Sequence, residues 1–428
     1  MKTGTRFVMA AALVLGVQAI VSCIDVEERT ERFCQDHPAI CDGGTGTPDG
    51  GSGRPDAGDA GDAGEDGGPD AGDAGHPRWA PAGTLSDART GHTATLLPDG
   101  RVLVTGGFAH ASGSGALATV EVYDSADGGS WTTLAPLTEA RGDHTATEVS
   151  GGMVLVVGGR SGSVPTKSVE LFDPSTGGSS QQDLAIAARA SHGAVLLPGT
   201  DQVLVMGGGG NAGSGFRDSA SYSVSGGTWS TSSGAMRLDR NVLSVTLVGN
   251  RVFAVGGYGE SGTQSSYDVY TPGQGWNATS GTLGERRHAH AAAEIGAGAL
   301  ATQLLVTGGK RTGDANTANA SSEVIPTAVD GGTASTPADD LFDARFAHTA
   351  TTLKSGDVLV VGGTDVDGDS LSTVELFDAS LLQWGMRPTL TTPRAGHTAT
   401  RLPDGSVLVI GGHGSSGAAL RSAERYWP

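Results

Sequence analysis

The chain has 428 residues, of which 70 are Gly, 18 are Pro and only 3 are Cys. This length exceeds that of one ordinary domain, and a glycine share of roughly twice the usual ~7% argues against a mainly helical protein. The 46 acidic and 27 basic residues give a formal net charge of −19. Because nucleic-acid binding needs clustered Lys and Arg that neutralise phosphates, this charge argues against a nucleic-acid partner.

Residues 1–22 are predicted to be a signal peptide. Lys2 and Arg6 precede an apolar run from Phe7 to Val21. About 15 apolar residues span only ~23 Å, which falls short of the ~30 Å hydrocarbon core and argues against a retained transmembrane helix. The segment Ile20-Val21-Ser22-Cys23 resembles a bacterial lipobox, which implies that Cys23 is lipidated, with plain secretion as the alternative. We therefore expect a lipid-anchored protein of the cell envelope, at the outer membrane or cell surface, that contacts the membrane only through this anchor.

Residues 23–41 contain the two other cysteines, Cys34 and Cys41. Outside the cytoplasm thiols oxidise, so a small disulfide loop is expected. A metal site with His37 is the alternative, but two thiols and one imidazole lack the fourth ligand of a structural zinc site.

Residues 42–78 consist mainly of Gly, Asp, Ala and Pro, with 9 acidic and 2 basic residues. This segment cannot bury apolar area and repels itself, so it is expected to be a disordered, extended linker. Calcium binding by Asp-rich repeats is the alternative, but it needs stacked strands, and nothing here favours a strand.

The remainder, residues 79–428, is dominated by an internal repeat. Gly-Gly pairs end seven apolar runs at intervals of 49 to 54 residues, and an arginine stands about 17 residues upstream of each pair. A histidine follows this arginine by three residues in six repeats, whereas the fourth repeat has Leu243. The pairs begin at Gly106, Gly158, Gly207, Gly256, Gly308, Gly362 and Gly411. The arginines are Arg89, Arg141, Arg189, Arg240, Arg287, Arg345 and Arg394, and the histidines are His92, His144, His192, His290, His348 and His397.

Each repeat contains signals for four strands. Asp99-Gly100 and Asp404-Gly405 are hairpin signals, because a tight two-residue turn needs positive φ. The runs that follow, such as Val-Leu-Val-Thr, are apolar at every position, which indicates a strand buried on both faces. A third strand is predicted at Val120-Glu-Val-Tyr-Asp124 and its equivalents, and a fourth carries a tryptophan in most repeats.

Four antiparallel strands covered on both faces describe a blade of a β-propeller, and a period of about 50 residues is that of kelch repeats. The Gly-Gly pair, the Glu and aromatic residue after it and the later Trp resemble the kelch motif. The sequence His-Thr-Ala-Thr-Leu-Leu-Pro-Asp-Gly resembles bacterial kelch proteins related to the propeller of galactose oxidase. We therefore expect an all-β, seven-bladed kelch-type β-propeller with four antiparallel strands per blade. The second and fifth repeats have Ser179 and Ser335 near the place of the tryptophan, so their outer edges should be thinner.

The ends of the repeat region are expected to meet. Trp79 precedes Arg89 by the same ten residues that separate Trp131 from Arg141, so the N-terminal segment reads as an outer strand without its first three partners. The last repeat ends after its third strand, near Tyr426. The N-terminal strand should therefore complete the last blade and remove its exposed edge.

The repeated polar residues are expected to be structural. The histidines recur once per blade, and equivalent positions around a ring lie too far apart for one metal with bonds of ~2 Å. The repeated Arg and the Glu of the third strand should form buried ion pairs. The glutamates are Glu121, Glu170, Glu323, Glu375 and Glu424, with Asp268 in the fourth blade.

Several catalytic and cofactor motifs fit poorly. Gly208, Gly210 and Gly213 match a dinucleotide-binding pattern, but no helix follows to hold the pyrophosphate. The resemblance to galactose oxidase would imply copper and a tyrosine joined to a cysteine, yet the propeller region has no cysteine and ends at its last blade. The segment Asp365–Asp369 resembles a calcium loop whose Gly is misplaced. We therefore expect no metal, no cofactor and no catalytic residue.

Variable loops on a rigid scaffold usually carry recognition. Strand alternation places the loops after the Gly-Gly pairs and the Arg-x-x-His segments on one face. The candidate binding residues in these loops are Phe108, His110, Arg160, Phe216, Arg217, Tyr258, Lys310, Arg311, Asp365, Asp367 and His413. We expect a monomeric binding or scaffold module for a protein or glycan. The alternative is a carbohydrate-active enzyme resembling sialic-acid epimerases, with carboxylates lining the central channel.

Overall fold

The computed structural model describes residues 77–428 except 211–214, 232–233, 312–316 and 329–331. The expectations for Cys23, Cys34 and Cys41, and for the linker up to residue 76, therefore lie outside the described residues. Arg78, the last residue of the predicted linker, is instead the first residue of a strand. Among the described residues, no helix is long and apolar enough to cross a membrane.

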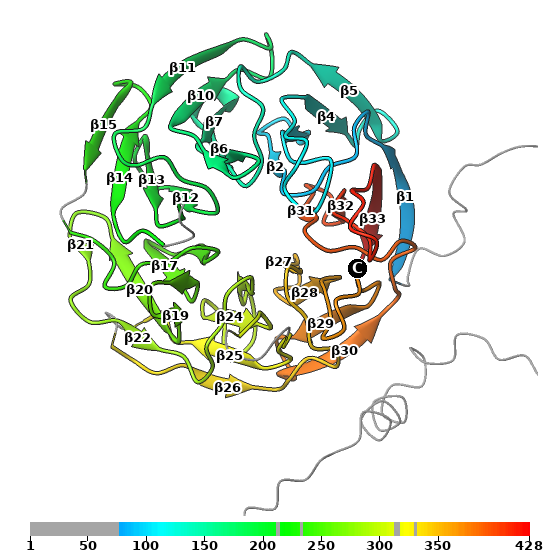
Figure 1. Cartoon of the computed structure of the whole chain (residues 1–428). Coiled ribbons are helices and arrows are strands. Elements are labelled where there is room, and N and C mark those ends of the chain that lie inside the picture. The colour runs from blue at the N-terminus through cyan, green and yellow to red at the C-terminus, as the bar shows by residue number, and fades with distance from the viewer. Residues whose placement is uncertain (1–76, 211–214, 232–233, 312–316, 329–331) are drawn as a thin grey trace, which may run out of the picture. The chain divides into compact units, whose positions relative to one another are not determined.

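Seven antiparallel sheets are arranged around a central axis as the blades of a propeller (Figure 1). The first four blades, from the innermost strand outward, are β2 (Thr93–Leu96), β3 (Val102–Thr105), β4 (Val120–Asp124) and β5 (Ser130–Leu134); β6 (Thr145–Val149), β7 (Met153–Val157), β10 (Ser168–Phe172) and β11 (Ser179–Asp183); β12 (Gly193–Leu196), β13 (Gln202–Met206), β14 (Ser219–Ser223) and β15 (Thr228–Thr231); and β16 (Ser244–Val248), β17 (Arg251–Val255), β20 (Ser266–Thr271) and β21 (Gly275–Trp276).

The last three blades are β23 (Ala291–Glu294), β24 (Leu304–Thr307), β25 (Ser322–Ile325) and β26 (Thr336–Ala338); β27 (Thr349–Thr352), β28 (Val358–Val361), β29 (Val374–Asp378) and β30 (Gln383–Arg387); and β31 (Thr398–Arg401), β32 (Val407–Ile410), β33 (Ser422–Trp427) and β1 (Arg78–Thr84). Strand β22 (Gly281–Thr282) also pairs with β20, and two short hairpins, β8 (Arg160–Ser161) with β9 (Val164–Pro165) and β18 (Tyr258–Gly259) with β19 (Gly262–Thr263), follow Gly-Gly pairs. A 3-10 turn, η1 (Ser150–Gly152), precedes β7.

The N-terminal strand closes the ring, as expected. Strand β1 pairs antiparallel with β33, with Trp79 opposite Tyr426. Their ring centroids are 5.1 Å apart, and the Trp79 indole N–H donates to the Pro388 carbonyl oxygen at 2.7 Å. The last blade is therefore completed by residues from both ends of the propeller, which removes the free edge that β33 would otherwise expose.

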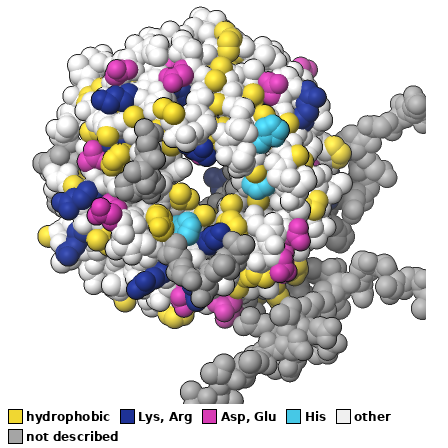
Figure 2. All heavy atoms as spheres, viewed as in Figure 1, with side chains coloured by type: hydrophobic (Ala, Val, Ile, Leu, Met, Phe, Trp, Pro, Cys, Tyr) yellow, Lys and Arg dark blue, Asp and Glu magenta, His cyan; other side chains and the backbone are white. Residues whose placement is uncertain are grey.

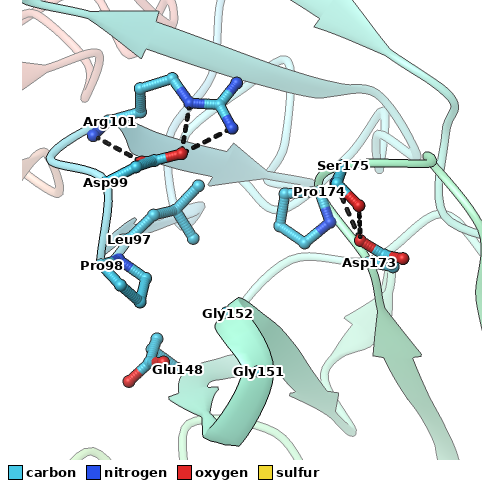
Figure 3. Close-up of a pocket in the computed structure, with 10 residues that line it drawn as sticks. All are labelled: Leu97, Pro98, Asp99, Arg101, Glu148, Gly151, Gly152, Asp173, Pro174 and Ser175. Atoms are coloured by element: carbon cyan, nitrogen blue, oxygen red, sulfur yellow. Dashed lines mark hydrogen bonds and ion pairs between the residues drawn. The ribbon is translucent and has the colours of Figure 1, made fainter.

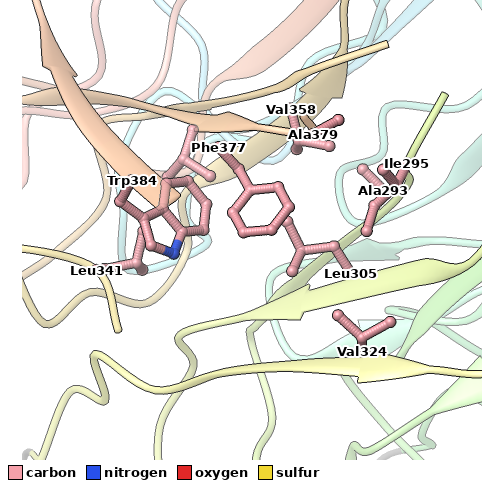
Figure 4. Packing of buried hydrophobic residues seen from close by; sticks show 10 residues of the cluster. Ala293, Ile295, Leu305, Val324, Leu341, Val358, Phe377, Ala379 and Trp384 are labelled. Atoms are coloured by element: carbon pink, nitrogen blue, oxygen red, sulfur yellow. The ribbon is translucent and has the colours of Figure 1, made fainter. Parts of the chain in front are cut away.

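The hydrophobic core lies between neighbouring blades. The last four residues of every second strand are buried, because each sheet is covered on both faces; these strands are β3, β7, β13, β17, β24, β28 and β32. Figure 4 shows one such interface, where Leu305 and Val324 of blade 5 pack towards Phe377 and Trp384 of blade 6. Burying a side chain of this size contributes roughly 1.5–3 kcal/mol.

The Asp-Gly hairpins form, but their turns are longer than the predicted two residues. The Leu97 N–H donates to the Arg101 carbonyl oxygen at 2.8 Å, so Pro98, Asp99 and Gly100 form a three-residue turn. Gly100 has φ +90°, the left-handed conformation that closes such a turn.

The Gly-Gly pairs exist because successive blades approach each other there. The N–H of the second glycine donates to the carbonyl oxygen of the repeated arginine in the next blade, and all seven bonds have lengths of 2.8 or 2.9 Å. A Cβ on Gly158 would lie 2.6 Å from the Arg189 carbonyl oxygen, and Gly158 has φ +58°. Only glycine meets both the steric and the conformational requirement.

A second ring of backbone hydrogen bonds joins the segments before the innermost strands. The residue preceding each repeated histidine, or Leu243, has φ between 51° and 61°, and its N–H donates to the equivalent carbonyl of the previous blade at 2.8–3.4 Å. The ring closes on itself through Gly91, Asp143, Ser191, Val242, Ala289, Ala347 and Gly396.

The repeated histidines are buried and structural. In six blades the imidazole Nε2 lies 2.8–3.1 Å from a hydroxyl of the preceding blade. Blade 3 has Gly193 where most blades carry this hydroxyl, and blade 4 has Leu243 in place of the histidine. Val245 occupies the space that a side chain on Gly193 would need. The interface between blades 3 and 4 therefore lacks both the hydroxyl and the histidine of the repeat, and apolar packing by Val245 takes their place.

The arginines form the expected buried ion pairs in six blades. Arg141 and Glu170 are both fully buried, and the guanidinium Nη2 lies 2.7 Å from the carboxylate. Blade 3 differs, because Ala220 stands at the position of the glutamate, opposite Val205, and Arg189 pairs instead with Asp218, whose side chain is 45% exposed.

Candidate binding surface

The loops after the Gly-Gly pairs and the segments before the innermost strands meet on one face of the propeller, as predicted. In every blade the residue after the Gly-Gly pair forms an antiparallel bridge with the residue after the repeated arginine, as Thr90 does with Phe108 and Asn241 with Tyr258. Five of the candidate residues occupy this one position, namely Phe108, Arg160, Tyr258, Lys310 and His413. Figure 2 shows this face, on which basic and acidic side chains are interspersed around the central opening. We call it the rim face.

Two of the candidates serve to join blades 1 and 2. Phe108 is only 2% exposed, so its placement on the recognition surface is corrected. The aromatic ring lies against Gly142 of the next blade and beneath the Arg160 guanidinium, which is 4.7 Å from the ring centroid. Arg160 also forms an ion pair with Asp143 at 2.7 Å. Burial raises the pKa of Asp143, and the nearby Arg160 opposes that rise.

A row of aromatic and basic side chains crosses blades 4 to 6 on the rim face. The exposed Tyr258 ring meets His288 edge to face with centroids 5.8 Å apart. The Lys310 ammonium lies 4.9 Å from the centre of the Phe346 ring. Burial lowers the pKa of His288, and the neighbouring Lys310 lowers it further. His288 is therefore neutral at physiological pH.

His110 and His413 lie where the loops of blades 1 and 7 meet. His110 is exposed and bridges to Ala418, while the His413 Nδ1 atom lies 3.3 Å from the Thr90 hydroxyl. Burial lowers the pKa of His413. This contact links the last blade to the first on the rim face.

Phe216 and Arg217 line a hollow between blades 3 and 4. Its volume is about 560 Å³, and its other walls include Leu238 and Glu260. Phe216 lies beneath the Arg189 guanidinium, which is 4.9 Å from the ring centroid. Arg217 is exposed, and within the described residues its guanidinium makes no hydrogen bond or ion pair. The hollow thus combines an unpaired cation with apolar surface from Phe216 and Leu238.

The remaining candidates are held by local contacts. Arg311 forms an ion pair with Glu285 at 2.9 Å. The Asp365 carboxylate accepts hydrogen bonds from the backbone N–H groups of Asp367 and Asp369, both at 2.9 Å. In the described part of the chain, no three His, Cys, Asp or Glu side chains are grouped so that they could hold a metal ion.

The innermost strands, which surround the central channel, carry few acidic residues. The seven innermost strands contain only two acidic residues, Glu148 of β6 and Glu294 of β23, which belong to blades 2 and 5. The pair of converging carboxylates expected for the carbohydrate-active alternative is therefore missing from these strands. A copper–radical site does not fit either, because residues 79–428 contain no cysteine to join a tyrosine.

Several surface residues were not anticipated from the sequence. Leu238 and Glu260 belong to the hollow between blades 3 and 4, and Asp218 replaces the repeated glutamate as the partner of Arg189. The sequence contained a signal for Asp218, because this residue is acidic and lies only two positions after Phe216. No sequence signal groups Leu238 with Glu260, because they come from different loops.

The closed ring of blades and the repeated contacts of the Gly-Gly pairs and buried arginines define a seven-bladed β-propeller. A model of the Kelch motif matches residues 141–177, which lie in the second repeat. Among solved structures, the chain is similar to a novel fungal alcohol oxidase of the AA5 family in complex with copper, with 16% identity and a TM-score of 0.64. The match covers 83% of this chain and 77% of that chain, and at this identity it shows the fold alone. No curated protein matched the sequence.

Proposed function

We propose that this propeller is a noncatalytic binding module that recognises a protein through its rim face. The observation that carries the proposal is the hollow between blades 3 and 4, where the unpaired Arg217 lies beside exposed apolar surface. The two rings of backbone hydrogen bonds position the described segments that flank the hollow, so these segments need little further ordering on binding. An Arg and a Tyr on such a surface are typical of residues that dominate protein interfaces.

A carbohydrate-active enzyme is not favoured. Such an enzyme needs at least two acid or base groups within reach of one substrate, whereas the two carboxylates of the innermost strands stand in blades 2 and 5. A glycan ligand on the rim face is the remaining alternative to a protein partner.

The rim assignment is tested by comparing two double variants. Arg217→Ala with Tyr258→Ala removes a cation and an aromatic ring from the rim face, while Lys354→Ala with Leu381→Ala removes an exposed cation and an exposed apolar side chain from hairpin turns of the other face. We expect the rim variant to lose a partner captured from an envelope extract, with at least tenfold weaker affinity for the purified partner. Equal affinities of both variants and the parent would discard the proposal, and binding restricted to glycan would replace the protein by the glycan alternative.

We further propose that the protein is held in the cell envelope by a lipid on Cys23, with residues 42–78 as the linker. The charged start, the apolar run and the lipobox-like segment support this placement. We expect labelled fatty acid to enter the parent but not Cys23→Ser. Labelling of the variant equal to that of the parent would refute the anchor.

A further inference from the structure

A second hollow opens on the face opposite the rim, between the hairpin turns of blades 1 and 2 (Figure 3). Its volume of about 440 Å³ falls within the ~300–1,000 Å³ that is usual for ligand pockets. None of the candidate binding residues lines it, so the hollow has no part in the proposed rim function.

Two turns supply apolar walls to this hollow. Leu97 and Pro98 come from the turn between β2 and β3, and Pro174 comes from the turn after β10. Figure 3 shows Leu97 and Pro174 on facing sides of the open space. Proline rings are rigid, so these walls lose little conformational freedom when a side chain lies against them.

Three carboxylates surround the apolar walls, but only one has a cationic partner. The Asp99 carboxylate accepts a hydrogen bond from the Arg101 Nε at 2.8 Å, and this contact lowers the pKa of Asp99. Among the described residues, the Asp173 carboxylate accepts hydrogen bonds only from its own turn, including the Ser175 hydroxyl at 2.6 Å, which lowers the pKa of Asp173. Asp173 therefore stays ionised at neutral pH without a compensating charge.

Glu148 of β6 is the least compensated group of the hollow. Within the described residues its carboxylate makes no hydrogen bond and no ion pair, and partial burial raises the pKa of Glu148. Because Glu148 is only partly exposed to water, a cation placed against its carboxylate would form a charge-assisted hydrogen bond that water replaces incompletely.

We propose that this hollow binds an arginine side chain of a partner protein. The methylene stem of arginine suits the walls formed by Leu97, Pro98 and Pro174. The planar guanidinium suits the carboxylate of Glu148, which it can engage with two parallel hydrogen bonds, while the Asp173 charge adds to the attraction. An ammonium is more strongly hydrated and lacks the matching fork, so arginine is favoured over lysine.

The experiment titrates the full chain in detergent with the peptide acetyl-Gly-Arg-Gly-amide and follows binding by calorimetry. Glu294→Gln is the matched control, since Glu294 occupies the same position of the innermost strand in blade 5 as Glu148 does in blade 2. We expect saturable binding to the parent, at least tenfold weaker binding to Glu148→Gln, and unchanged binding to Glu294→Gln and to Arg217→Ala. The last variant separates this site from the rim face.

Three outcomes would overturn the proposal: no saturable binding of the arginine peptide, equal affinity of Glu148→Gln and the parent, or equal affinity for the matching lysine peptide. If free arginine amide binds as tightly as the peptide, the proposal that the arginine belongs to a partner protein is wrong. Urea unfolding of Glu148→Gln is the folding control. We expect its midpoint to equal or exceed that of the parent, because the substitution removes an unpaired charge. A weaker affinity of this variant then reflects the loss of the carboxylate and not a loss of folded protein.

Discussion

At the scale of single residues, the repeated arginine organises each blade. Its side chain is fully buried in all seven blades, and one guanidinium N–H group donates to the carbonyl of the first glycine in its own Gly-Gly pair at 2.6–2.9 Å. Its backbone carbonyl accepts from the Gly-Gly pair of the preceding blade. One residue type therefore connects the strands of a blade and the blades to each other.

The acid partners of two of these arginines should differ in their contribution to stability. Glu170→Ala leaves the buried Arg141 guanidinium with only the part-exposed Glu139 carboxylate at 3.5 Å, and it is expected to lower the free energy of unfolding by about 3 kcal/mol. In Asp218→Ala, water can take the place of the lost carboxylate, because the Asp218 side chain is 45% exposed. We therefore expect the free energy of unfolding to fall by only about 1 kcal/mol. Urea unfolding of both variants measures this, and similar midpoints would contradict the distinction.

At the scale of elements, the Gly-Gly pairs determine how closely the blades approach. The pair follows the second strand, whose last four residues are buried, and the close approach at its first glycine leaves no room for a Cβ. Blade seams that differ in sequence adjust locally, as Gly193, Leu243 and Val245 show between blades 3 and 4. The repeat is thus held by backbone contacts, and side chains vary around them.

Two glycines of blade 2 separate the steric effect from the conformational one. Gly158 and Gly162 have nearly the same φ, +58° and +59°, but a Cβ on Gly162 would meet nothing within 4 Å. Gly162→Ala should cost about 1 kcal/mol from its left-handed backbone. Gly158→Ala should cost about 3 kcal/mol or more, because it also displaces the Arg189 carbonyl. Equal losses in urea unfolding would show that the close approach is unimportant.

At the scale of the whole molecule, the stability of the closed propeller depends on six buried, neutral histidines. Burial is the main cause that lowers the pKa of each one, to about 3 for His192 and His397. In the unfolded chain these side chains titrate near pH ~6.5, so below that pH the unfolded state binds more protons. Their contribution to stability is complete above pH ~6.5 and is lost progressively as the pH falls towards 3.

On acidification, the propeller should therefore lose stability at a higher pH than it would from protonation of its carboxylates alone. Between pH 7 and pH 5, His192 and His397, whose pKa is lowered to about 3, are each expected to remove roughly 2 kcal/mol of stability. Burial lowers the pKa of the other four in the same direction, so they add to this loss. Urea midpoints measured at pH 7.5, 6 and 5 test this. The variant His192→Gln should show a shallower pH dependence than the parent, and a midpoint unchanged down to pH 5 would contradict the buried neutral ring.

The repeat pattern along the chain was enough to predict the number of blades, their four strands and the closure through Trp79 and Tyr426. These features follow from a repeated local pattern, in which glycine conformation and two-sided burial leave few arrangements. The tertiary structure alone decided that Phe108 is covered by Arg160, that Asp218 replaces a glutamate, and that two hollows open between blades. Each of these is set by contacts between residues of different strands or neighbouring blades, which no periodic pattern along one strand specifies.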